Sequence, residues 1–189
     1  MANVGLSNIW FSELTEGSDG TATYAGARQL AKAVSCSVDI TNNDAKLYAD
    51  DVLAESDTSF ASGNISLTVD DDPDEVFAPL LGHEYDETTN VVTKTSNDTA
   101  PYVGIGRILT KMVGGHYKYK VSFLYKVKFA EPSADENSKN ENIEFATPTI
   151  EGIISSLADI NGTWGISKTF DSKADALTYL KGLMAEPTP

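Results

Sequence analysis

The chain has 189 residues, of which 41% are hydrophobic, and its formal net charge is −14. This length is enough for one domain with a buried core, and this composition excludes a disordered protein. The negative charge argues against sequence-specific DNA binding and against binding to acidic membranes, because both of these partners are themselves anionic.

The acidic residues are unevenly distributed. Residues 1–98 hold eighteen Asp and Glu against four Lys and Arg, whereas residues 99–189 hold ten of each. The single Cys36 excludes an internal disulfide bond, and its alternating neighbours predict a small core residue. No stretch approaches about 18 apolar residues, and the first residues lack the basic and apolar regions of a signal peptide. Neither a membrane span nor a secretion signal is therefore expected.

Residues 1–26 are predicted to form an N-terminal arm. They contain a short apolar patch, Ile9-Trp10-Phe11, followed by a Gly- and Thr-rich run from Gly17 to Gly26 that is typical of a flexible connection. An aromatic pair on an arm needs a partner surface, so Trp10 and Phe11 are candidates for a contact with another molecule.

Residues 27–189 are predicted to form a single β-sandwich domain. Residues 28–40 alternate between apolar and small or polar side chains, which predicts a strand. Residues 41–44 (Thr-Asn-Asn-Asp) are a turn signal, and residues 45–53 are expected to pair back as a hairpin. Residues 54–64 are acidic and rich in small residues, which predicts a long loop before a strand at 65–69.

A short internal helix is predicted after residue 72. Asp72 is the expected N-cap, Pro73 the first helical residue and Glu75 the partner in a capping box, while Gly82 is placed to end the helix. Acidic residues favour a helix N-terminus through its dipole, which accounts for the acidic cluster at 70–75. A calcium site remains the alternative, although the spacing differs from that of an EF-hand.

The second half contains most of the predicted sheet. Residues 83–95 are expected to form a hairpin, and residues 101–113 a strand in which Gly104 and Gly106 mark a bulge or a close backbone approach. In residues 117–129 every odd position is aromatic or β-branched, and every even position except Leu124 is Lys or Ser. This period of two predicts one long strand with a single buried face.

The remaining elements follow the same logic. Residues 130–142 are polar and predict a solvent loop, whereas residues 143–157 and 163–170 predict strands. Residues 172–184 predict a C-terminal amphipathic helix, with Ser172 and Asp175 as a capping box.

The sequence offers little for catalysis or metal binding. The two histidines, His83 and His116, each lie beside a glycine and have no second His or Cys at ligand spacing, so no zinc site or other cofactor is expected. The abundant carboxylates leave an acid-pair hydrolase open as a weak alternative, although nothing singles out one pair.

One basic patch stands out in the second half. It consists of Arg107, Lys111, Lys118, Lys120, Lys126 and Lys128, and no Asp or Glu occurs between residues 98 and 131. Strand alternation places the lysines and the aromatic residues on opposite faces, which argues against binding of single-stranded nucleic acid. A basic strip that meets the acidic half of a neighbouring copy is better supported, and this favours self-association.

Five segments together carry a family resemblance. They are residues 2–9 (Ala-Asn-Val-Gly-Leu-Ser-Asn-Ile), the strand at 30–40, the acidic segment at 45–57, residues 100–106 (Ala-Pro-Tyr-Val-Gly-Ile-Gly) and the helix at 170–180. With these segments the chain resembles, over almost its whole length, the major tail proteins (tail tube proteins) of long-tailed bacteriophages of Gram-positive hosts.

The resemblance implies a mainly β fold, sandwich-like or barrel-like, with a flanking helix. It implies a structural, non-enzymatic virion protein, made in the host cytoplasm, whose hexameric rings stack into the tail tube. DNA would pass through the lumen without specific binding, and the tape-measure, tail-terminator and distal-tail proteins would be partners. A negative lumen would keep DNA from adhering.

These implications suggest specific residues. Asp50, Asp51, Glu55 and Asp57 are expected to face the lumen or the next ring. Trp10 and Phe11 are expected to bury against a neighbouring subunit. The basic residues Arg107, Lys118, Lys120, Lys126 and Lys128 are expected to face the exterior or acids of a neighbour. The main alternative is a β-sandwich module that binds carbohydrate or a surface, which predicts exposed aromatic residues on one face and a stable monomer.

Overall fold

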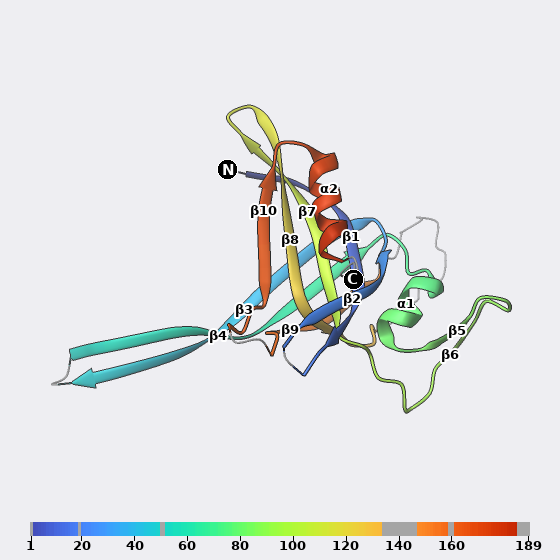
Figure 1. Cartoon of the computed structure of the whole chain (residues 1–189), viewed down its shortest axis with the longest axis horizontal. Coiled ribbons are helices and arrows are strands. Elements are labelled where there is room, and N and C mark those ends of the chain that lie inside the picture. Colours follow the sequence, from blue (N-terminus) through green and yellow to red (C-terminus); the bar gives the residue numbers. More distant parts are fainter. Residues whose placement is uncertain (1, 19, 50–51, 134–146, 159–160, 185–189) are drawn as a thin grey trace, which may run out of the picture.

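The computed structural model describes residues 2–18, 20–49, 52–133, 147–158 and 161–184, and the fold is mainly β, as predicted. Figure 1 shows a main sheet, a small second sheet and two short helices. The main sheet contains β1 (Ala2–Glu16), β2 (Ala22–Gln29), β3 (Ala33–Ala49), β4 (Val52–Val69), β7 (Val103–Val113), β8 (His116–Phe129), β9 (Thr149–Ser155) and β10 (Gly165–Phe170). The second sheet pairs β5 (Glu84–Asp86) with β6 (Val91–Thr93), and the helices are α1 (Asp74–Leu81) and α2 (Lys173–Leu183).

The main sheet branches at β8. Its strand order is β2-β1-β7-β8-β9-β4-β3, and β10 also pairs with β8. On the edge of β8 that faces away from β7, β10 pairs with residues 119–124 and β9 pairs with residues 126–129. The partner of β8 therefore changes near Tyr125, in the middle of the strand.

A bulge lies at the same place in β8. Ile105 of β7 pairs with Leu124, whereas Val103 pairs with Val127, so β8 carries one extra residue between these pairs. An extra residue shifts the alternation of side chains by one position. The odd residues before the bulge and the odd residues after it therefore point to opposite faces of the sheet.

Two hydrophobic cores result. On one face, Val121 and Phe123 of β8 pack with Ala176 and Leu180 of α2. On the other face, Val127 and Phe129 join a larger cluster that includes Leu80 of α1. The prediction that residues 117–129 bury a single face is wrong for this reason, although the prediction of one long strand is confirmed.

The predicted close approach at Gly104 and Gly106 is confirmed. A Cβ atom on Gly106 would lie 2.1 Å from Cδ1 of Leu180 in α2, and one on Gly104 would lie 2.5 Å from the ring of Tyr24. These glycines therefore let α2 and the aromatic side chains settle onto the backbone of β7.

Residues 1–26 do not form an arm. Residues 2–16 are β1, which pairs with β2 on one side and β7 on the other. Phe11 is 1% exposed and belongs to the larger core of its own chain, so it has no surface left for a neighbouring subunit. Trp10 is partly buried on the face covered by α2. The Gly- and Thr-rich run resembles a flexible connection in sequence because β2 contains small residues.

The turn predicted at residues 41–44 and the loop predicted at 54–64 are both strand. Asn42 pairs with Phe60 and Ala45 with Asp57 in one continuous ladder between β3 and β4. The sequence gives no alternation here because most described side chains of these two segments are exposed, so turn-forming residues dominate the pattern.

Both helices lie where the sequence predicts them, but their caps differ. The N-cap of α1 is Pro73, one residue later than expected, and no side chain caps it. Ser172 is the N-cap of α2, again without a side-chain hydrogen bond. The C-terminal cap of α1 is Gly82 with φ 78°, as predicted.

We expect Gly106→Ala to lower the free energy of unfolding by about 1–3 kcal/mol, because Leu180 must leave its position against β7. Gly182→Ala is the matched control, since nothing lies within 4 Å of its added Cβ and alanine favours the helix by about 0.5–1 kcal/mol. Urea denaturation measures both values. Equal stability of the two variants would contradict the close-packing argument.

Candidate assembly surfaces and a polar cluster

The hairpin of β3 and β4 projects far from the rest of the fold (Figure 1). β9 pairs with β4 only over residues 63–68. Beyond that point residues 41–49 of β3 and 52–62 of β4 pair only with each other among the described residues. We call this projecting part the ribbon; at ~3.4 Å per residue it is about 30 Å long.

The ribbon has no core of its own. Its described side chains are almost all exposed, including those of Asp44, Ser56 and Thr58. An isolated two-stranded hairpin is only marginally stable in water, and both outer edges carry backbone groups able to pair with another strand. The ribbon is therefore a surface that a second molecule would stabilise.

Two of the four predicted acidic residues belong to this projecting element. Glu55 and Asp57 lie on β4 within the ribbon, opposite Leu47 and Ala45 in the register. Asp50 and Asp51 lie outside the described residues. That these four acids face a lumen or a neighbouring ring remains a prediction.

The predicted basic strip is divided between the two faces of the sheet. Lys118 and Lys120 precede the bulge in β8. They share a face of the sheet with Leu124, which belongs to the larger core. Lys126 and Lys128 follow the bulge, where Val127 and Phe129 point into the larger core and the lysines point away from it. The five basic residues therefore do not form one continuous surface.

Two of these lysines have acidic partners in the same chain. Lys118 Nζ lies 2.5 Å from the Asp171 carboxylate, and Lys126 forms an ion pair with Glu16 in which both side chains are mostly buried. Glu16 also accepts a hydrogen bond from the backbone N–H of Ala158. Lys118 and Lys126 therefore pair with acidic residues of their own chain and do not require those of a neighbouring copy.

The other basic residues have different surroundings. Lys128 lies 5.4 Å from the centroid of the Tyr102 ring, and Lys120 has no ion pair with a described acid. Nη1 of Arg107 is buried without a hydrogen-bond partner among the described residues. Burial raises the pKa of the partly buried Cys36 thiol, and nearby Arg107 opposes that shift.

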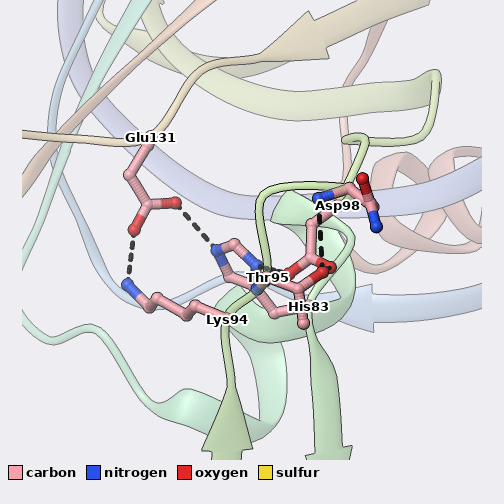
Figure 2. Close-up of polar contacts among 6 residues, drawn as sticks. His83, Lys94, Thr95, Asp98 and Glu131 are labelled. Atoms are coloured by element: carbon pink, nitrogen blue, oxygen red, sulfur yellow. Dashed lines mark hydrogen bonds and ion pairs between the residues drawn. The ribbon is translucent and has the colours of Figure 1, made fainter.

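A polar cluster around His83 is the second notable feature, and sequence spacing did not indicate it. Figure 2 shows the imidazole between two carboxylates. Nδ1 lies 2.6 Å from Asp98 and Nε2 lies 2.8 Å from Glu131. Lys94 pairs with the other oxygen of Glu131, and Thr95 donates from its backbone N–H and its hydroxyl to Asp98.

The cluster favours charged side chains throughout. The hydrogen bond with Asp98 raises the pKa of His83, and Glu131 adds to this effect against the cost of burial. Hydrogen bonds from Thr95, and then His83, lower the pKa of Asp98 to about 2. Lys94 is the main cause of the lowered pKa of Glu131. A protonated imidazole is needed to donate from both nitrogens at once.

This arrangement holds segments together rather than carrying out chemistry. Both ring nitrogens face carboxylates, so the imidazole has no contact with a nucleophile that it could activate. Within the described ranges, no group of three or more His, Cys, Asp or Glu residues has the geometry to hold a metal ion. The cluster joins the residues after α1 and β6 to the segment that follows β8.

The acidic cluster at 70–75 is partly engaged in local contacts. Asp70 accepts a hydrogen bond from the backbone N–H of Lys32 and lies 3.6 Å from its ammonium group. Asp71 accepts a hydrogen bond from the N–H of Asp72. Asp74 and Glu75 occupy the first turn of α1.

No protein-family model and no curated protein sequence matches the chain. A solved structure that is similar to it is the cryo-EM structure of the anti-feeding prophage cap, which is described as the AFP tube terminating cap. The alignment covers 91% of this chain and 93% of that chain at 13% sequence identity, with a TM-score of 0.42.

None of the described helices is long and apolar enough to cross a membrane. The longer of the two, α2, has 11 residues, and it packs on the main sheet through Ala176 and Leu180.

The His83 cluster predicts a specific dependence of stability on pH. Because the folded-state pKa of His83 is raised, its stabilising effect is full below its unfolded pKa of about 6.5 and is lost as pH rises through the folded value. The stability contributed by the carboxylates depends on pH in the opposite sense. It is present above about pH 4, and the part contributed by Asp98 is lost as pH falls toward its pKa of about 2.

We therefore expect the difference in Tm between the wild type and His83→Gln to be largest between roughly pH 5 and 6 and to shrink by pH 9. Differential scanning calorimetry across this range measures the difference. His116→Gln is the control, because His116 is exposed and forms no ion pair with a described residue. A difference that stays constant with pH would contradict the role of the imidazolium.

Proposed function

We propose that the chain is a structural subunit that associates with copies of itself through the ribbon, and that the assembly is the tube of a bacteriophage tail. The single observation that carries the proposal is the ribbon itself. It projects about 30 Å from the sheet, has no core and leaves both of its edges unpaired within the described residues. A chain that acts alone has no evident use for such an element.

Other edges of the fold support association. β2 pairs only with β1, and β10 pairs only with β8 among the described strands, so each has one free edge. Free edges promote uncontrolled pairing unless a partner covers them. A subunit that completes its sheet with a neighbouring copy turns this hazard into a means of assembly.

The tube follows from the resemblance to major tail proteins, and the charge of the chain agrees with it. A net charge of −14 suits a lumen through which DNA passes without binding. In this proposal the chain is a non-enzymatic virion protein that assembles as rings, and the tape-measure, tail-terminator and distal-tail proteins are its partners in the tail. Asp50, Asp51, Glu55 and Asp57 then line the lumen or the contact between rings.

A carbohydrate-binding module is less well supported. A groove of about 710 Å³ includes Tyr102, a residue that is 41% exposed. Lys126 and Lys128, however, lie 4.7 and 5.4 Å from the centroid of that ring. Trp10 has Lys181 over its ring, and Trp164 is stacked on Phe60. Each of these aromatic rings already has a partner where a sugar would stack.

The register of the hairpin allows a precise test. Ile40 pairs with Gly63, so replacing residues 41–62 by Asn-Gly joins the two strands through a two-residue turn and leaves the β4–β9 ladder intact. We expect the wild type to form rings or tubes that lengthen with concentration in negative-stain electron microscopy. The shortened variant is expected to remain a monomer with a Tm close to that of the wild type.

Assembly of the shortened variant to the same extent as the wild type would contradict the role of the ribbon. A wild type that stays monomeric at every concentration and binds glycans on an array would favour the carbohydrate-binding module instead.

A further inference from the structure

The root of the ribbon has an unusual backbone. The ladder between β4 and β9 ends at the pair Gly63 and Ile154, and a bulge follows at once. Thr41 pairs with Ser62 but Asn42 pairs with Phe60, so β4 carries one extra residue, Ala61. A bulge bends its strand and increases the local twist. The ribbon therefore changes direction where its support by the sheet ends.

An aromatic stack lies beside this bend. The rings of Phe60, on the ribbon, and Trp164, which precedes β10, are nearly parallel at 5°, with centroids 4.9 Å apart. Both side chains are partly buried and pack against the edge of the larger core. In Figure 1 the lower end of β10 lies next to the point where β3 and β4 leave the body of the fold.

Hydrogen bonds tie the backbone at Trp164 to β8 and the residue before it to the segment that follows β9. Its carbonyl oxygen accepts a hydrogen bond from the N–H of Tyr125 in β8 at 3.1 Å. The carbonyl of the preceding Thr163 accepts one from the N–H of Leu157 at 2.8 Å. The ring of Trp164 is thus presented by backbone that belongs to the body of the fold, while Phe60 belongs to the projecting part.

The crowding at Gly63 adds a second constraint at the same level. A Cβ atom there would lie 2.9 Å from Cδ1 of Ile40 and 3.2 Å from Cδ1 of Ile154. The neighbouring strands therefore close tightly around β4 just below the bend. On the ribbon side of the bend, the ring of Phe60 contacts the body of the fold.

We infer that the Phe60–Trp164 stack is the positioning contact that fixes the direction of the ribbon relative to the main sheet, and that this direction is the one in which the ribbon reaches a second copy of the chain. The second part rests on the proposed function. A bulge alone permits a range of bend angles, because a two-stranded ribbon twists and flexes readily. The parallel rings select one angle, since tilting the ribbon separates them.

Spin labels test the direction of the ribbon without assembly. In a Cys36→Ser background the labels occupy Ser56→Cys, on the ribbon, and Ser167→Cys, on β10; both positions are exposed. Double electron–electron resonance at low concentration gives the distribution of distances between them. We expect one narrow distribution in this background, and a markedly broader one when either Trp164→Ala or Phe60→Ser is added.

Two further variants serve as controls. Trp164→Phe keeps a ring and is expected to keep the distribution narrow. Trp10→Ala removes the other tryptophan, which lies on the face covered by α2, and is also expected to leave the distribution narrow. Unlabelled Trp164→Ala and Phe60→Ser are expected to assemble several-fold more slowly than the wild type, and Trp164→Phe at nearly the wild-type rate.

Narrow distributions in both Trp164→Ala and Phe60→Ser would overturn the inference, whatever the rate of assembly. Broad distributions with a wild-type rate of assembly would overturn the link between ribbon direction and assembly. If the wild type itself fails to assemble, the proposed function fails, and the distances still decide whether the stack sets the direction of the ribbon.

Discussion

The extra residue in β8, between Leu124 and Val127, is the constraint on which most of the structure depends. The odd-numbered side chains before it point to one face of the sheet and those after it point to the other. A single strand therefore contributes to both hydrophobic cores. It also coincides with the change of partner from β10 to β9. Without it, α2 and α1 would compete for one apolar face, and the lysines of β8 would form one strip.

The sequence predicts those elements whose apolar side chains recur with a regular period. Alternation locates β8, the apolar stripe locates α2, and Gly104 and Gly106 mark a close contact on β7. The bulge escapes prediction because Tyr125 and Val127 continue the alternation although their side chains point to opposite faces. The ribbon escapes it because the two-residue period comes from burial of one face, and most described side chains of the ribbon are exposed.

The functional features are harder to predict from the sequence than the fold. His83 bonds to Asp98 and Glu131, which are 15 and 48 residues away along the chain, so no local spacing indicates the cluster. The Phe60–Trp164 stack joins two segments that the sequence keeps far apart. The strand structure of residues 45–49 and 52–57 follows from cross-strand pairing, which the composition of this acidic segment does not indicate.

The continuity of β4 has a mechanical consequence. The same strand forms one side of the ribbon and then the ladder with β9, over residues 63–68. In an antiparallel ladder the hydrogen bonds lie perpendicular to the strands, so a pull along β4 loads all of them together in shear instead of breaking them one after another. Tension applied to the ribbon is thereby transmitted through β9 to β8 at the centre of the sheet. The fold is built to carry a load from its projecting part into its core.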